Sequence, residues 1–193
     1  MSHPGLVDVI HWLEDLFDRL QFRRSYGGAI AYNFYGPPRL TQDVDVLALV
    51  PDLKAPALID AFKAWSCLHG ARDPRPIELP AVLDDLRGKA HLTVFQCQGI
   101  RTEIFVPWHP FHHRVLERSP ERTLEGRRIR IHAAEDLIVF KKIFDRPKDI
   151  TDIKAILLAQ KGKLDIERLK SDANELLTEA SYRELEKLIA DFR

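Results

Sequence analysis

Apolar residues recur at the spacing of an α-helix in several stretches of this chain. The clearest stretch is 5–22, where one face is apolar and acidic residues occupy the opposite face. A period of 3.6 residues is typical of a helix that buries one side against a core. The same spacing predicts helices over residues 5–22, 29–34, 53–66, 134–144, 149–159, 165–178 and 181–192, and a short helix within the proline-containing stretch 107–121.

Strands are indicated by shorter apolar runs and by alternation of apolar and polar residues. The segment 43–50 ends in an unbroken apolar run, which predicts a central strand covered on both faces. The segments 91–97 and 100–106 alternate or are β-branched and are separated by Gln98-Gly99, which indicates a hairpin. The remaining assignments are a short strand or turn at 25–28, an edge or half-exposed strand at 127–132 and a loop over most of 70–89.

These elements divide the chain by character. An α/β part covers residues 1–132 and a helical region covers residues 133–193, with a soft boundary because helices can pack directly on a sheet. A chain of 193 residues can bury a hydrophobic core as one large domain or two small ones. The predicted fold class is therefore α/β (α+β), a small mixed sheet with flanking helices followed by a C-terminal helical part.

The composition is that of an ordinary globular protein, with 45% hydrophobic and 30% charged residues and a formal net charge of zero. A neutral chain has no global attraction to nucleic acid or to an anionic membrane, although a local basic patch is compatible with it. The N-terminus shows no leader pattern, and the apolar runs are too short for a bilayer. We expect a cytoplasmic protein in which Cys67 and Cys97 are buried or half-buried apolar side chains, since their spacing matches no metal site.

The stretch that follows Gly27-Gly28 carries the strongest indication of chemistry. Asp43 and Asp45 alternate at the start of an apolar strand, so both carboxylates point to the same face. Adjacent carboxylates repel one another, and a hard divalent cation such as Mg²⁺, shared with substrate phosphates, is the usual counterion. The two glycines would let a backbone turn approach those phosphates closely. The combination indicates a nucleotidyl- or phosphoryl-transfer site.

Two metal ions would require a third carboxylate, and Glu103 is the best candidate. It lies in the predicted strand 100–106, one strand away from the aspartates in a plausible sheet, with Ile104 facing the opposite side. The alternative is that Glu103 is a cross-strand partner of an arginine such as Arg101 or Arg130.

Gly27-Gly28, Asp43-x-Asp45 and a carboxylate on a later strand resemble the nucleotidyltransferase superfamily that includes DNA polymerase beta. The longer run from Gly27 to Asp45 is more similar to the bacterial group that contains the AbiEii-type toxins. A second block, 134–153, resembles the downstream Lys…Arg-x-Lys-Asp-x-x-Asp signature of that group, and the two blocks cover about half the chain. The third carboxylate is Glu in this chain, where Asp is common in the group.

The resemblance implies a role for each matching position. Gly27 and Gly28 would bind the triphosphate, and the metal ligands for Mg²⁺ or Mn²⁺ would be Asp43, Asp45 and Glu103, the last also helping to activate the acceptor hydroxyl. Further positions would fix the loop before the strand, contact phosphate or take part in catalysis. Arg39 and Thr41 belong to the first two groups, and Lys141, the better match by position, or Lys142 would neutralise phosphate charge. Asp149 is a further candidate catalytic residue, and we expect Lys141, Asp149 and Asp152 to face the nucleotide cleft.

Each signal has a simpler alternative. A lone Gly-Gly is usually a turn, and a lone Asp-x-Asp is usually a solvated loop end, although here it opens an apolar strand. Asp149 and Asp152 follow Pro147 at a helix start, where the helix dipole and capping favour Asp.

Two further clusters are assigned to packing or to a solvated surface. One matches no zinc-site spacing and is interpreted as a loop near the acceptor site at best; it contains Trp108, His109, His112 and His113. The other is a small basic ridge on a strand, with RNA or phosphate binding as the alternative; it contains Arg127, Arg128 and Arg130.

By this resemblance, we expect a metal-dependent enzyme that transfers a nucleoside monophosphate from an NTP, such as ATP, to a hydroxyl group of a tRNA, a protein or a small molecule. The group also contains toxins of toxin–antitoxin pairs, so an antitoxin partner is included. The alternatives are a non-catalytic nucleotide- or partner-binding module on the same fold, and a small-molecule nucleotidyltransferase of the antibiotic-modifying type. The presence of all three carboxylates argues against the non-catalytic alternative.

Overall fold

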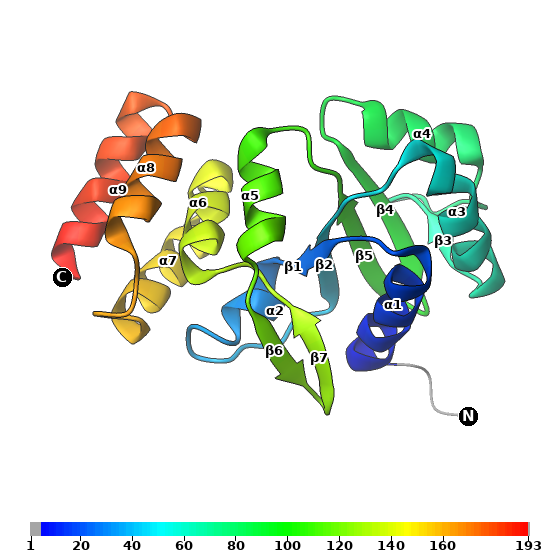
Figure 1. The fold of residues 1–193 in the computed structure, drawn as a ribbon, viewed down its shortest axis with the longest axis horizontal. Helices are drawn as coiled ribbons and strands as arrows, with labels where there is room; N and C mark the ends of the chain where they lie inside the picture. Colours follow the sequence, from blue (N-terminus) through cyan, green and yellow to red (C-terminus); the bar gives the residue numbers. More distant parts are fainter. Residues whose placement is uncertain (1–4, 193) are drawn as a thin grey trace.

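Five strands form the main sheet of the computed structural model, which describes residues 5–192 (Figure 1). In spatial order they are β1 (Arg24–Tyr26), β2 (Asp43–Ala48), β5 (Ile100–Phe105), β4 (Leu92–Cys97) and β3 (Leu68–His69). β2 and β5 run parallel, and the other neighbours are antiparallel. A separate two-stranded sheet is made of β6 (Glu121–Leu124) and β7 (Arg127–Arg130). The predicted small mixed sheet is confirmed.

Helices precede, cover and follow this sheet. In chain order they are α1 (Leu6–Leu20), α2 (Gly28–Tyr32), the 3₁₀ turn η1 (Asp52–Lys54) with α3 (Ala55–Ala64), α4 (Leu79–Arg87), α5 (Pro110–Arg118), α6 (Ala134–Phe144), α7 (Pro147–Ala159), α8 (Ile166–Leu176) and α9 (Glu179–Asp191). Every predicted helix occurs within a few residues of its expected bounds, because each has the amphipathic spacing that packing requires. No helix among residues 5–192 is both long enough and apolar enough to cross a membrane.

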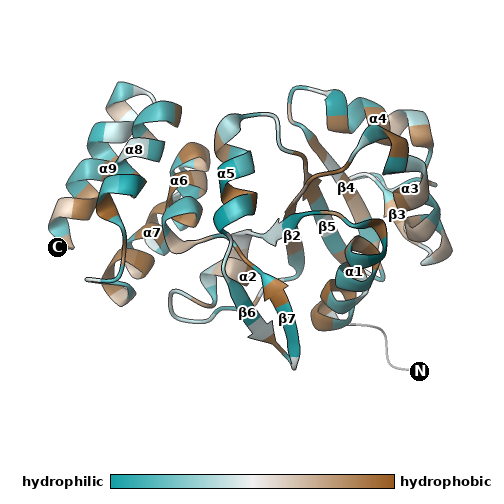
Figure 2. Cartoon of the chain, viewed as in Figure 1, coloured by the Kyte–Doolittle hydropathy of each residue, from teal (hydrophilic) through white to brown (hydrophobic). Residues whose placement is uncertain are grey.

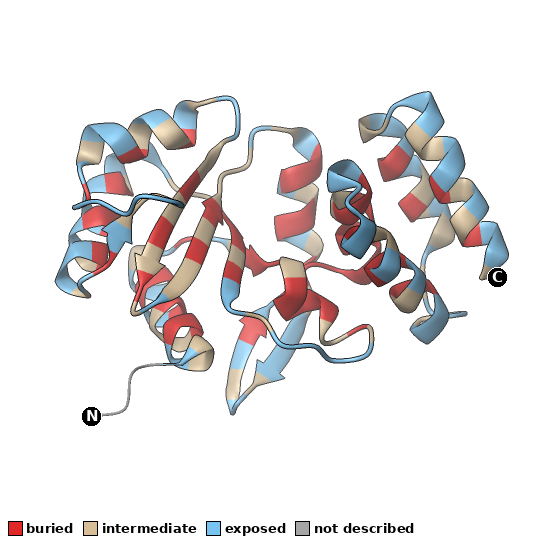
Figure 3. Ribbon diagram, turned by 180° about the vertical axis from the view of Figure 1, so that it is seen from behind, coloured by how far each residue is buried: buried red, intermediate tan, exposed pale blue. Residues whose placement is uncertain are grey.

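The two faces of the main sheet differ in what covers them. On β4 and β5 the buried side chains alternate with half-buried ones, and Phe95 of the buried face packs on Phe62 of α3 with ring centroids 4.2 Å apart. Figure 3 views the sheet from the other side, where no helix lies in front of β4 and β5. The half-buried residues of these strands therefore face an open side of the sheet.

The C-terminal helices extend the molecule away from the sheet (Figure 1). α6 joins them to the α/β part, since its Phe140 packs on Phe111 of α5 with ring centroids 5.3 Å apart. α8 and α9 are largely hydrophilic, as Figure 2 shows, and their apolar residues are turned inward, with Leu169, Leu185 and Ile189 buried. The predicted division into residues 1–132 and 133–193 follows this change of character and stays a prediction.

One local prediction is wrong, and one strand was not predicted. Residues 70–89 were expected to be mostly loop, but Leu79–Arg87 forms α4. Pro80 suits the first turn of a helix, and Val82 and Leu86 lie four residues apart on its buried side. The edge or half-exposed strand predicted at 127–132 is confirmed as β7, which pairs with the unpredicted strand β6 in a separate sheet.

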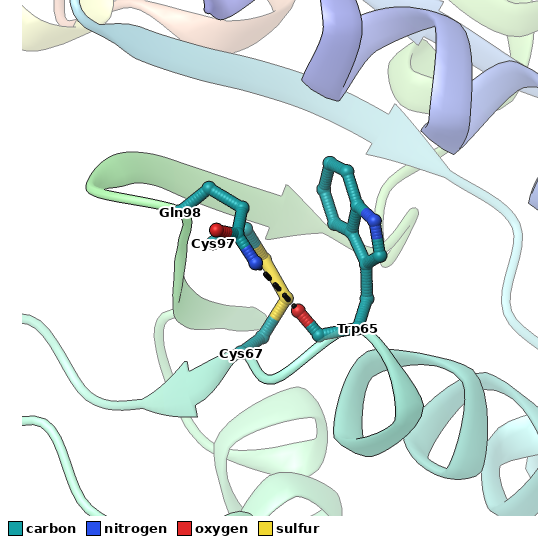
Figure 4. The surroundings of a disulfide bond; sticks show 4 residues. All are labelled: Trp65, Cys67, Cys97 and Gln98. Atoms are coloured by element: carbon teal, nitrogen blue, oxygen red, sulfur yellow. Dashed lines mark hydrogen bonds between the residues drawn. A yellow bond between two sulfur atoms is a disulfide. The ribbon is translucent and has the colours of Figure 1, made fainter. Parts of the chain in front are cut away.

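Cys67 and Cys97 are both buried, as predicted, but they also form a disulfide, which was not predicted (Figure 4). Cys67 follows α3 and Cys97 ends β4, and the packing of α3 on β4 brings their Cα atoms to 4.4 Å. The next residue, Gln98, donates a hydrogen bond from Nε2 to the carbonyl oxygen of Trp65 at 3.0 Å. Disulfides persist mainly in oxidising environments, so this pair does not support the expectation of a reducing cytoplasm.

We expect the disulfide to stabilise the fold by about 2–4 kcal/mol, since it closes a loop with a sequence separation of 30. The double variant Cys67→Ser/Cys97→Ser should therefore unfold at a lower temperature than the oxidised wild type. Thermal unfolding with and without dithiothreitol measures the effect. Reductant should lower the wild-type melting temperature and leave the double variant unchanged; equal stability of oxidised and reduced wild type would contradict the expectation.

Candidate active site

The three predicted carboxylates lie on the open face of the main sheet. Asp43 and Asp45 belong to the first half of β2, and the parallel register pairs Asp45 directly with Glu103 of β5. Directly paired residues of neighbouring strands project to the same side of a sheet. Ile104, the residue after Glu103, is fully buried on the opposite side. The predicted placement of Glu103 on the same face as the aspartates is confirmed.

The Gly27–Gly28 turn is packed directly against β2. The amide of Gly27 donates a hydrogen bond to the carbonyl oxygen of Asp45 at 2.9 Å. Gly28 has a φ of +51°, and a Cβ atom built on it would lie 1.7 Å from Oδ2 of Asp45. Both the backbone conformation and the lack of space therefore require glycine at position 28.

Asp45 is an electrostatically strained carboxylate. Burial, together with the negative charges of Glu103 and Asp43, raises its pKa to about 6, and Lys141 and Lys148 oppose this shift only in part. The site thus carries more negative charge at Asp45 than its neighbours neutralise. This is the electrostatic condition that a bound cation would relieve.

Glu103 has a cation beside it. Arg101 lies two residues earlier on the same face of β5, and its guanidinium is 2.5 Å from Oε1 of Glu103. Glu103 therefore has an arginine partner, as the alternative proposed, but the pair lies within one strand and is not the cross-strand pair that was expected. Arg130 pairs with Glu121 instead, at 3.1 Å. An ion pair of this kind on a half-exposed surface is compatible with exchange of partners.

The donor set fits a hard divalent cation in its chemistry. Asp43, Asp45 and Glu103 offer only carboxylate oxygens, which suit Mg²⁺ or Mn²⁺, and the raised pKa of Asp45 marks unneutralised charge. Within residues 5–192 there is, however, no group of three His, Cys, Asp or Glu side chains arranged to hold a metal ion. The expected convergence of all three carboxylates on one point is thus not seen while Glu103 contacts Arg101.

The second sequence block forms a buried network of ion pairs. Nζ of Lys141 in α6 lies 2.6 Å from Asp152 and 3.8 Å from Asp149, both in α7. Asp149 also accepts from Nε of Arg146 at 2.6 Å and from the Arg146 backbone amide at 3.3 Å. The capping alternative therefore applies to Asp149. Lys141 and the two aspartates are all buried rather than open to bulk water.

This network reaches the loop before β2 through Arg39. The Arg39 guanidinium contacts Asp152 at 3.1 Å and lies over the ring of Tyr32 at 5.4 Å. Asn33 binds both the amide and the carbonyl of Arg39, at 3.0 and 2.9 Å. Thr41 accepts from the amide of Asp43 at 3.2 Å. Arg39 and Thr41 therefore fix the geometry of the loop, which is one of their two predicted roles.

The choice between Lys141 and Lys142 is decided by orientation. Lys142 points away from the carboxylates and pairs with Asp145 at 2.8 Å and Glu184 at 2.6 Å. Lys141 lies close enough to Asp45 to lower its pKa. Adjacent residues on a helix point about 100° apart, so only one of the two lysines can face the site.

Several residues near the site were not identified from sequence. Tyr32 packs beneath both Arg39 and Lys141, and the ring of His132 lies against Gly27. Arg146 belongs to the second sequence block, but no role was predicted for its charge. A hydrogen bond to Asp149 and the negative charges of Asp45 and Glu103 raise the pKa of Arg146. No local sequence motif identifies these residues as part of the site. The only signal for His132 is its position at the end of the alternating segment 127–132.

The two additional clusters are integrated into packing and surface ion pairs. Trp108 stacks on His91 with ring centroids 5.3 Å apart, and His112 stacks on Phe140 at 5.6 Å. The basic ridge pairs with acidic residues: Arg127 with Asp15 and Asp18, and Arg128 and Arg130 with Glu121.

No protein-family model matches this sequence, and no curated protein matches it. The structure is nevertheless similar to solved nucleotidyltransferases. Antibiotic-resistance factor ANT(2″)-Ia matches over 94% of this chain and 95% of its own, with 15% identity and a TM-score of 0.58. Its complex with adenylyl-2″-tobramycin matches over 88% and 97%, with 13% identity and a TM-score of 0.57.

A third similar structure is the lincosamide antibiotic adenylyltransferase LnuA bound to lincomycin, with a TM-score of 0.52 and 11% identity over 76% of this chain and 93% of that one. The chain therefore has the nucleotidyltransferase fold, as the sequence predicts. Identities this low establish the fold alone, and the resemblance to the AbiEii-type group stays a prediction.

The strained charge of Asp45 predicts a stabilising substitution. We expect Asp45→Asn to raise the stability of the metal-free protein by about 1–2 kcal/mol at pH 7.5, less than the full pKa shift implies because the side chain is half-buried. With a folded pKa of about 6 and an unfolded value of 3.8, the charge destabilises the fold fully above pH 6 and not below 3.8.

Chemical denaturation in EDTA at pH 7.5 and pH 4 measures this effect. The gain should be present at pH 7.5 and largely absent at pH 4. Asp43→Asn, at the exposed position two residues earlier, is the matched control and should change stability less. A variant that is less stable than wild type at pH 7.5 would show that the Asp45 charge is favourable in the folded state.

Proposed function

We propose that this protein is a metal-dependent nucleotidyltransferase, which transfers a nucleoside monophosphate from an NTP to a hydroxyl group and releases pyrophosphate. The observation that carries the proposal is the packing of the Gly27–Gly28 turn against the unneutralised carboxylate of Asp45 on an open sheet face. A phosphate-bearing substrate and a cation would meet at this contact. A purely structural turn has no need for a destabilising charge beside it.

The proposed roles follow from position and charge. Gly27 and Gly28 form a turn without side chains, whose backbone would contact the phosphates, and Lys141 supplies a buried positive charge close to Asp45. Arg39 and Thr41 hold the loop that leads into Asp43. Positioning and charge neutralisation are most of what phosphoryl transfer requires from a protein.

Asp43 and Asp45 would hold Mg²⁺ or Mn²⁺, and Glu103 would complete the set. When bound, the metal would neutralise charge on the phosphates and on the attacking and leaving oxygens. Glu103 is also the group proposed to accept the proton of the acceptor hydroxyl. Its contact with Arg101 must open for this, because the oxygen that faces the guanidinium is not available to the acceptor hydroxyl.

Asp149 is assigned a supporting role in the proposal. It lies 3.8 Å from Nζ of Lys141 and 2.6 Å from Nε of Arg146, so it orients two cations that face the carboxylates. Asp152 performs the same function toward Lys141 and Arg39. These contacts tie the C-terminal helices to the nucleotide site.

A small-molecule acceptor is the favoured choice among tRNA, protein and small molecules. Similar structures include antibiotic-modifying enzymes, one in complex with adenylyl-2″-tobramycin and one bound to lincomycin. Binding of tRNA would require a wide basic groove. The arginines of the basic ridge are instead paired with acidic residues, so the ridge does not favour tRNA as the acceptor. Three hypotheses remain: a toxin role with an antitoxin partner, a cytoplasmic location, and a non-catalytic binding role.

We expect NTP binding to depend on Mg²⁺ or Mn²⁺ and to be lost in the double variant Asp43→Ala/Asp45→Ala. Calorimetric titration of each NTP, in Mg²⁺ and in EDTA, measures this directly. Turnover is followed as pyrophosphate release with aminoglycosides, lincosamides or total tRNA as acceptor, with mass spectrometry of the products. Asp60→Ala is the control, since Asp60 is exposed on α3, which packs on the opposite face. Equal binding by the double variant in EDTA would contradict a metal-dependent site.

We expect Lys141→Ala and Asp149→Ala each to lower turnover roughly tenfold or more, the scale for loss of one electrostatic group at a transition state. Lys142→Ala is the matched control: this neighbouring lysine is equally buried but pairs away from the site. Melting temperatures are measured for all three variants. Near-normal turnover of Lys141→Ala with reduced thermal stability would show that the network has only a structural function.

A further inference from the structure

The side chain of His132 lies directly beneath the glycine turn of the proposed site. A Cβ atom built on Gly27 would lie 2.8 Å from Nε2 and 3.0 Å from Cδ2 of the His132 ring. The φ of Gly27 is −113°, which is outside the left-handed region. Gly27 is therefore required because the imidazole occupies the space that a side chain would take.

The ring is held from several directions. Its Nδ1 forms a hydrogen bond with the hydroxyl of Ser25 at 2.7 Å, and the Ser119 hydroxyl lies 2.6 Å from that of Ser25. One face of the imidazole stacks on Phe140 of α6, with ring centroids 5.0 Å apart. These contacts come from β1, from the residue after α5 and from α6, so the ring cannot move without disturbing three elements.

The backbone of His132 is anchored to the same strand that leads into the turn. Its amide donates to the carbonyl oxygen of Tyr26 at 2.8 Å, and its own carbonyl accepts from the hydroxyl of Tyr35 at 3.0 Å. Tyr26 immediately precedes Gly27, and Tyr35 follows α2. His132 therefore contacts the chain on both sides of the glycine turn.

The imidazole is neutral in this environment. Burial, with a smaller contribution from the neighbouring His112, lowers the pKa of His132 to about 3. A neutral ring can pack closely against a backbone turn without adding a charge beside the carboxylates.

On its other side the turn is fixed by β2. The amide of Gly27 donates to the carbonyl oxygen of Asp45 at 2.9 Å, and Gly28 lies against the Asp45 carboxylate. The turn is thus enclosed between the imidazole of His132 and the strand that carries the acidic pair. A displacement of the ring would change the distance between the turn and Asp45.

We propose that His132 is a positioning residue that fixes the distance between the Gly27–Gly28 turn and Asp45 and thereby determines the affinity for the NTP triphosphate. The proposal rests on the proposed function of the site. His132 touches neither substrate nor metal; it acts through Gly27, while Ser25 and Phe140 keep the ring in place.

The test compares His132→Ala, His132→Asn, Gly27→Ala and the double variant Gly27→Ala/His132→Ala with wild type. For each protein, the Kd of a non-hydrolysable ATP analogue with Mg²⁺, the KM and kcat with ATP, and the melting temperature are measured. His113→Ala, an exposed histidine on α5, and Gly5→Ala, where an added Cβ meets only Asp8 at 3.8 Å, are the controls.

We expect His132→Ala to raise the Kd and KM roughly tenfold and to change kcat less, since a displaced turn weakens phosphate binding before it affects the carboxylates. His132→Asn can still bind Ser25 and should recover melting temperature without recovering affinity, which keeps the test informative if His132→Ala folds poorly. Gly27→Ala should lower the melting temperature more in wild type than in His132→Ala, where the ring that it collides with is absent.

Wild-type Kd and KM in a destabilised His132→Ala variant would overturn the proposal, because His132 would then be only a core residue. An equal cost of Gly27→Ala in both backgrounds would also overturn it, because the ring would not be the obstacle. Absence of binding of every NTP by wild type itself would instead refute the proposed function. This result is distinguishable, since it is obtained before any variant is compared.

Discussion

The contact between the Gly27–Gly28 turn and Asp45 constrains the rest of the site. The turn donates a backbone hydrogen bond to β2 and leaves no room for a side chain between Gly28 and the carboxylate. Asp45 is thereby half-buried beside Glu103, with which it is paired across parallel strands. The result is a carboxylate whose pKa rises to about 6, a cost that folding tolerates only because burial of the surrounding core exceeds it.

Opposite charges connect this strained centre to the C-terminal helices. Lys141 lies between Asp149 and Asp152 and also acts on Asp45, and Arg39 carries the network back to the loop before β2. Buried ion pairs contribute little net stability, since desolvation offsets much of their attraction. Their value here is geometric, because they fix the helical region relative to the sheet. The two parts distinguished by sequence character therefore meet at the candidate site.

Much of this arrangement could be predicted from local patterns. The alternation of Asp43 and Asp45 with apolar residues placed both carboxylates on one face, and the hairpin after residue 91 placed Glu103 beside them. An arginine partner of Glu103 was expected only as a cross-strand alternative. The observed partner, Arg101, lies two positions earlier on the same strand, where the two side chains share a face. Helix α4 was missed because glycine and proline in residues 70–89 outweighed the short apolar spacing of Val82 and Leu86.

The sequence by itself determined the periodic elements, the acidic pair and the glycine turn, because these depend on residues close together in the chain. Only the tertiary structure decided which distant residues surround them. His132 lies 105 positions after Gly27 and reaches it through the packing of β1, α5 and α6. Cys67 and Cys97 meet because α3 packs on β4. Such contacts arise from side-chain packing in three dimensions, which leaves no local period or motif in the chain.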